Sequence, residues 1–153
     1  MKIYRENLKL ETREKNQFFD ITDNVNKVIR DSGIKEGMVL VQSSHTTTGV
    51  IIIEAEPNAL EDIVDYLNEK APFDAGYRHD DPSLRKDCPE DEPKNCDAHI
   101  KSSCYSQSSV AWSVSQGKLE LGRYQRLLFQ EFDGPCPRKH KSMRQYLVKV
   151  MGE

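Results

Sequence analysis

The run Met-Val-Leu-Val-Gln at residues 38–42 and the run Val-Ile-Ile-Ile at residues 50–53 decide the fold class of this chain. Both runs are rich in β-branched residues and too short for buried helices, so they predict strands. Their apolar residues are consecutive rather than alternating, which predicts strands buried on both faces. Further strands are expected at residues 2–12 (at a sheet edge), 110–114, 119–121, 124–131 and 145–151.

Helical patterns lie between these strands. Thr22 is predicted to cap a helix that ends at Gly33. Pro57 is predicted to begin a second helix, because apolar residues follow it at helical spacing. A short third helix is expected at residues 98–105. Together the patterns predict one domain over residues 1–153 with an α+β fold, a mostly antiparallel sheet on which two or three helices pack.

Charge and composition limit the partners of the chain. Its 22 basic and 25 acidic residues give a net charge of −3, so we expect no nucleic-acid partner and no membrane surface. No apolar run approaches the roughly 20 residues of a membrane span, and the N-terminus lacks the apolar core of a signal peptide. We therefore expect a cytoplasmic protein whose four cysteines are reduced thiols. The hydrophobic share of 37% is lean, which favours many loops or a core completed by subunit contacts.

Residues 71–97 form a long segment with little apolar periodicity. The segment contains four of the seven prolines and many acidic residues. A long irregular loop inside a small domain is usually functional or disordered. For the acidic residues 80–94 the sequence does not decide between these two possibilities.

The sequence has four histidines, and three of them lie in suggestive places. His45 begins the run His-Thr-Thr-Thr-Gly after a predicted strand, where hydroxyls could cradle an anion or orient an imidazole. His79 lies inside the long loop and His99 at its end. Their separations contain no local metal motif, so the fold would have to assemble a shared site. The alternative is that they are ordinary surface or core histidines. His140, among basic residues, is expected to be solvated.

Several other polar residues have two interpretations each. Glu54 ends the run 50–53, where it either meets an imidazole, a metal or an arginine, or simply reaches solvent or caps the next helix. Arg138 could grip a phosphate or pair with Asp133. Cys96 and His99 have the spacing of a weak zinc motif.

Several stretches taken together resemble one known family. They are Ser44 to Thr47, the Ile-Ile-Ile-Glu run ending at Glu54, Tyr77 to Asp80, Asn95 to Lys101, Gly117 to Gln125, and Glu131 to Pro135. In this order they resemble the YjbQ-like family of small conserved proteins, often labelled secondary thiamine-phosphate synthases. Two positions depart from the family pattern: Tyr124 replaces a tryptophan, and the stretch around Arg138 is less rich in arginine.

The resemblance implies an antiparallel β-sandwich assembled as a homotrimer. It also implies that His45, His79 and His99 converge on a divalent metal ion, with Glu54 beside them. Zinc is the expected ion, and magnesium is the alternative for a diphosphate substrate.

These expectations give a hypothesis about the role of each residue. His45 and Glu54 are the predicted catalytic residues, with Glu54 as a general base or as a group that orients a ligand. The residues predicted to bind a small anionic metabolite are Thr46, Thr47, Gln125 and Arg138.

Three hypotheses about function follow. The first is a metal-dependent enzyme, either a thiamine-phosphate synthase or a hydrolase that uses metal-bound water. The second is a protein that binds an anionic metabolite without turning it over. The third is a domain stabilised by zinc bound to Cys96 and histidines, which metal removal would unfold.

Overall fold

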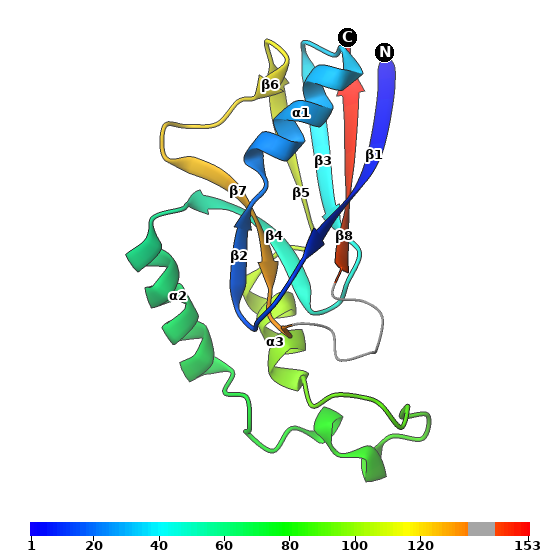
Figure 1. Ribbon diagram of the computed structural model, residues 1–153, viewed down its shortest axis with the longest axis vertical. Helices are drawn as coiled ribbons and strands as arrows, with labels where there is room; N and C mark the ends of the chain where they lie inside the picture. Colours follow the sequence, from blue (N-terminus) through cyan, green and yellow to red (C-terminus); the bar gives the residue numbers. More distant parts are fainter. Residues whose placement is uncertain (135–142) are drawn as a thin grey trace.

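Strands dominate the structure, a computed structural model that describes residues 1–134 and 143–153 (Figure 1). In these residues the strands form two sheets, and every strand pair is antiparallel. The first sheet has the spatial order β1 (Lys2–Glu11), β8 (Met143–Gly152), β3 (Gly37–Ser43), β5 (Ser109–Ser115) and β6 (Lys118–Leu119). The second has the order β2 (Gln17–Asp20), β7 (Gln125–Glu131) and β4 (Thr48–Glu54). The predicted α+β fold is confirmed.

The helices within this part of the chain are α1 (Thr22–Ser32), α2 (Pro57–Lys70) and α3 (Cys96–Tyr105). As predicted, α1 ends at Gly33, whose φ of 70° is a left-handed conformation that glycine adopts without strain. The prediction that Thr22 caps α1 is wrong, because Thr22 is already helical and its hydroxyl accepts a hydrogen bond from Leu127 N–H of β7 (2.8 Å). As predicted, α2 begins at Pro57, and the Glu56 carboxylate before it accepts a hydrogen bond from Ala59 N–H.

The main core lies where the two sheets and α1 meet. Valines of β3, β5 and β8 face Val50 and Phe129 of the second sheet and the apolar face of α1. Figure 1 shows α1 lying across the first sheet, above the three strands of the second.

The prediction that the strands at 38–42 and 50–53 are buried on both faces is wrong. In β3, Val39 and Val41 are buried but Met38 is 48% exposed, because α1 and the second sheet cover only one face of the first sheet. In β4, Val50 is buried, whereas residues 51–53 are only half-buried because β4 lies at the edge of its sheet.

The segment between α2 and α3 extends below the sheets in Figure 1. It contains two short 3₁₀ turns, Arg78–Asp80 and Pro82–Leu84, and it leads into α3, which begins two residues earlier than predicted. Among the helices that the structure describes, none is long and apolar enough to cross a bilayer.

Candidate functional site

His79 and His99 lie against each other at the point where the long loop meets α3. Their ring centroids are 4.8 Å apart and the ring planes are tilted by 52°. The two residues are 20 positions apart in sequence, so the loop between them brings the rings together. Both side chains are partly buried. The two imidazoles therefore lie together at a position that solvent can still reach.

Asp80 holds this arrangement in place. One of its oxygens, Oδ1, accepts hydrogen bonds from the backbone N–H groups of Asn95 and Cys96, both at 3.1 Å. These groups lie at the start of α3, where N–H groups have no partner inside the helix and attract a negative charge. The same oxygen lies 3.1 Å from His79 Nδ1. Since an ionised carboxylate only accepts, Nδ1 carries the proton and Nε2 keeps its lone pair in the neutral ring.

The environment of His99 favours its neutral form. Burial lowers the pKa of His99, and the nearby His79 and Arg85 act in the same direction. The carboxylates of Asp133 and Glu92 oppose this shift but do not cancel it. A neutral imidazole retains a lone pair for a metal ion or a substrate proton.

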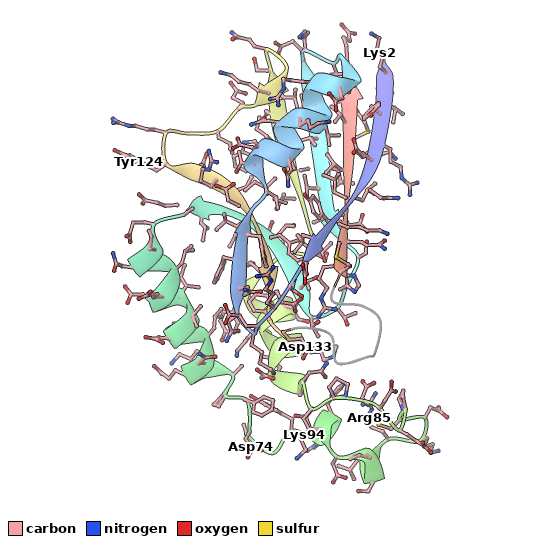
Figure 2. The ribbon with its side chains drawn as sticks, viewed as in Figure 1. Lys2, Asp74, Arg85, Lys94, Tyr124 and Asp133 are labelled. Carbon is pink, nitrogen blue, oxygen red and sulfur yellow. The ribbon has the colours of Figure 1, made fainter. Side chains whose placement is uncertain are left out.

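Asp133 joins the site to the sheets. It accepts a hydrogen bond from Asn95 Nδ2 (2.9 Å), and its own backbone N–H donates to Glu131 Oε1 at the end of β7 (3.0 Å). Glu131 in turn forms a buried ion pair with Arg144 of β8. Figure 2 shows Asp133 at the lower end of the sheets, above the loop that carries Arg85. The site is therefore anchored to both sheets.

Asn95 has one unsatisfied atom. The residue is buried, and its Oδ1 has no hydrogen-bond partner within residues 1–134 and 143–153. A buried carbonyl oxygen without a partner is costly. A hydrogen-bond donor of a bound molecule would relieve this cost.

His45 lies in the turn between β3 and β4. Its Nε2 accepts a hydrogen bond from the backbone N–H of Gln145 (3.3 Å), and its backbone N–H donates to Ser43 Oγ (3.3 Å). Thr46 is exposed beside it, whereas Thr47 is buried and its carbonyl accepts a hydrogen bond from Phe132 N–H.

A groove of about 710 Å³ adjoins His45. Hydroxyl and amide side chains from the ends of β3 and α3 and the starts of β4 and β5 line it. Ser102 of α3 closes one wall, because its hydroxyl donates to Thr48 O (2.8 Å). His99 lies on the same helix, one turn before Ser102.

The structure brings together two of the three predicted metal ligands. Within the described part of the chain, no group of three His, Cys, Asp or Glu side chains lies close enough to hold a metal ion. The Cys96 alternative is weak, since burial, Asp80 and Asp97 raise the pKa of the thiol and so disfavour the thiolate that zinc requires.

Glu54 and Gln125 lie far from the histidines in this chain. They face each other at the end of β4 and the start of β7. The His45 turn and Asp133 lie at the opposite end of the same strand pair, about 20 Å away for a seven-residue strand. Glu54 is exposed, and Glu56 rather than Glu54 caps α2. Arg138 and His140 lie outside the described residues.

Sequence reasoning missed two polar groups at this end of the molecule. One is Asp80, for which the adjacent His79 was a possible signal. The other is a buried ion pair within α3, where Lys101 Nζ lies 3.1 Å from Asp97 Oδ2 and also donates to Asn68 Oδ1 of α2. The spacing of four residues within a helix could have indicated this pair.

These features define a small α+β protein with paired imidazoles between a helix N-terminus and a strand end. The chain belongs to the family whose model is described as "UPF0047 protein YjbQ-like", which matches residues 6–153. A UPF0047 protein of Archaeoglobus fulgidus is 40% identical over 86% of this chain and 94% of its own length. UPF0047 protein YugU of Bacillus subtilis is 31% identical over 95% of this chain and 97% of its own length.

Solved structures agree with this assignment. A YbjQ-like protein of unknown function from Sulfolobus solfataricus superposes with a TM-score of 0.83 at 28% identity, covering 99% of both chains. An uncharacterised conserved protein of the YjbQ/UPF0047 family from Clostridium acetobutylicum has a TM-score of 0.79 at 34% identity, covering 95% of this chain and 99% of its own. The family of this chain is therefore established.

Proposed function

We propose that this protein is a metal-dependent enzyme acting on a small anionic metabolite, with His79 and His99 as two ligands of a divalent cation. The observation that carries the proposal is the ring pair itself, in which Asp80 orients His79 and burial keeps His99 neutral. A carboxylate that accepts the Nδ1 proton of a histidine is a usual partner of zinc-bound imidazoles. Zinc is the proposed ion, and magnesium is the alternative with a diphosphate substrate.

The residues fit a metal ion in part. His79 and His99 offer lone pairs, and His45 is the proposed third ligand, although it would first exchange its hydrogen bond from Gln145 N–H. A divalent ion bound there would neutralise charge on a phosphate leaving group. The hydroxyl groove beside His45, with Thr46 in its lining, would hold the rest of the substrate.

The proposed reaction is the one that the family resemblance implies. A pyrimidine diphosphate is joined to a thiazole phosphate. A carbon–nitrogen bond forms to the thiazole nitrogen, the carbon–oxygen bond to the diphosphate breaks, and pyrophosphate leaves. The thiazole nitrogen has no proton to lose, so in this reaction Glu54 is the proposed group that orients a ligating histidine; in the hydrolase alternative it is the proposed general base. Because Glu54 lies at the far end of β4, it acts only if a neighbouring subunit supplies it, as the homotrimer of the proposal would allow.

Zinc titration by calorimetry, with metal analysis of the purified protein, tests the proposal. We expect His79→Ala and His99→Ala to lower zinc affinity by about ten- to hundredfold or more. Replacing a residue that only hydrogen-bonds to a metal ligand costs about ten- to hundredfold in affinity, and replacing the ligand itself should cost at least as much. His45→Ala tests the third ligand in the same way. Unchanged zinc affinity in both His79→Ala and His99→Ala would refute the metal site.

A further inference from the structure

Helix α2 leaves part of its apolar face uncovered. Ile63 and Leu67 pack against Ala98 and Phe132 in a small second core. One turn earlier, Leu60 and Val64 instead line an open groove of about 500 Å³ between α2 and β2. Figure 1 shows α2 standing beside the second sheet at this level. One side of the apolar face of α2 is thus packed, and the neighbouring side faces a groove.

This α2–β2 groove has an apolar floor and an acidic rim. Phe18, Leu60 and Val64 form the floor, and Glu14, Glu61 and Asp65 contribute to the rim. Glu61 and Asp65 lie one helical turn apart, where like charges destabilise a helix. In the part of the chain that the structure describes, neither of them forms an ion pair. The groove therefore suits a partner that carries an apolar group next to a cation.

The loop between β6 and β7 has that chemistry. Tyr124 is 61% exposed, and the guanidinium carbon of the exposed Arg123 lies 5.3 Å from the centre of its ring. Figure 2 shows Tyr124 at the outer edge of the molecule, on a loop that projects away from the sheets. An aromatic ring beside an arginine is a typical anchor at protein interfaces.

The loop is held in shape before any partner arrives. Gln125 N–H donates to Gly122 O (3.1 Å), and Gly122 N–H donates to the Gln125 side-chain oxygen (2.8 Å). A preorganised loop loses less conformational entropy when it binds.

We infer that the α2–β2 groove receives Arg123 and Tyr124 from a second copy of this chain. Tyr124 covers the floor of Phe18, Leu60 and Val64, and Arg123 lies between Glu61 and Asp65. The contact is heterologous, since a loop of one subunit meets a different surface of the next, and such contacts generate rings when the rotation closes. The inference rests on the two surfaces and not on the metal site.

Light scattering of the full chain at micromolar concentration tests the contact. The wild type should be larger than one 17.6 kDa chain. Arg123→Glu, and separately Glu61→Lys with Asp65→Lys, should weaken association by about tenfold or more, since like charges then face each other. All three changes in one chain reverse both surfaces and should restore association. Lys118→Glu, an exposed charge change on β6, is the matched control and should associate like the wild type.

Circular dichroism of each variant checks whether it is folded. Photocrosslinking provides a second measurement, which does not depend on variants with weakened association. A photoreactive phenylalanine analogue at position 124 should link to peptides containing residues 60–65 of a second, isotope-labelled chain. A monomeric wild type, association unchanged in the single-surface variants, failure of the reversed chain to associate, or crosslinks only to other regions would each overturn the inference.

Discussion

At the residue scale, Asp20 joins three elements with one carboxylate. Its Oδ1 accepts a hydrogen bond from Thr22 N–H at the start of α1 (3.0 Å), and its Oδ2 accepts one from Arg126 Nε of β7 (2.6 Å). Burial alone would raise the pKa of Asp20, but the hydrogen bonds from Thr22 and Arg126 outweigh burial and lower it. The ionised form is therefore favoured in the folded state.

Asp20→Asn should lower the free energy of unfolding at pH 7 by about 1 kcal/mol, because it removes the negative charge from the half-exposed ion pair with Arg126 and from the hydrogen bond that Thr22 N–H donates. Because the folded pKa lies below the unfolded value of 3.8, this contribution is present above that pH and disappears as the pH falls through the folded pKa. Urea unfolding at pH 7 and at pH 3 measures both effects. Asp23→Asn is the control, since Asp23 is exposed and lies 3.8 Å from Arg126. A difference between wild type and Asp20→Asn that does not shrink at low pH would contradict this account.

Asp80 is the residue on which the proposed metal site depends most. Asp80→Asn keeps the shape of the side chain but removes its charge. The His79 ring then faces an amide that can accept or donate, in place of a carboxylate that only accepts and so fixes the tautomer. We expect zinc affinity to fall by about ten- to hundredfold, measured by calorimetry. Asp81→Asn is the matched control, because the Asp81 carboxylate bonds only to Ser83 within the described residues. Equal zinc affinity in the wild type and in Asp80→Asn would show that Asp80 has only a structural role.

At the element scale, the buried pair of Glu131 and Arg144 ties the two sheets together. Glu131 ends β7 of the second sheet and Arg144 begins β8 of the first. Their side chains form two hydrogen bonds, one of them from Arg144 Nη2 to Glu131 Oε1 (3.0 Å). Since Glu131 also accepts the Asp133 N–H, the pair sets the position of Asp133 beside the histidines.

Glu131→Gln should cost about 3–5 kcal/mol of unfolding free energy, because it removes the charge of one member of a buried, hydrogen-bonded ion pair. Denaturant unfolding measures the loss. The double variant Glu131→Gln with Arg144→Met removes both charges and should recover part of it. A double variant less stable than Glu131→Gln would contradict this explanation. It would show that Arg144 stabilises the protein even when Glu131 carries no charge.

At the scale of the whole molecule, the sequence indicated most of the fold because local patterns are strong in it. The helix ends at Pro57 and Gly33 and the alternation in β1 follow from backbone geometry. β2 was missed because four residues without alternation form a strand only through long-range pairing with β7. The consecutive isoleucines of β4 misled the burial prediction, since apolar runs do not reveal that a strand lies at a sheet edge.

The candidate site was harder to predict than the fold. The pairing of His79 with His99 depends on how the segment between them closes, and no spacing rule describes such a segment. The family resemblance suggested these residues, and the structure explains their contact through Asp80. It also separates Glu54 and Gln125 from the histidines by the length of β4. One chain therefore cannot bring all the predicted catalytic residues together in the described arrangement.

This separation leads to a prediction about the assembled protein. If Glu54 takes part in the reaction, it must reach the histidines of a neighbouring subunit in the proposed homotrimer. Chains carrying only His99→Ala and chains carrying only Glu54→Gln should each be inactive on a confirmed substrate. Unfolding and refolding them together should restore part of the activity, since some interfaces then combine an intact His99 with an intact Glu54.

Each variant refolded alone is the control, and light scattering should give about three times the 17.6 kDa chain mass for all samples. A Glu54→Gln protein with full activity would remove Glu54 from the reaction. Mixed trimers without recovered activity would place Glu54 and His99 in the same subunit's site, which requires that β4 or its flanking loops rearrange.

A shared site makes catalysis depend on assembly, so activity per chain should also fall on dilution below the concentration at which the trimer dissociates.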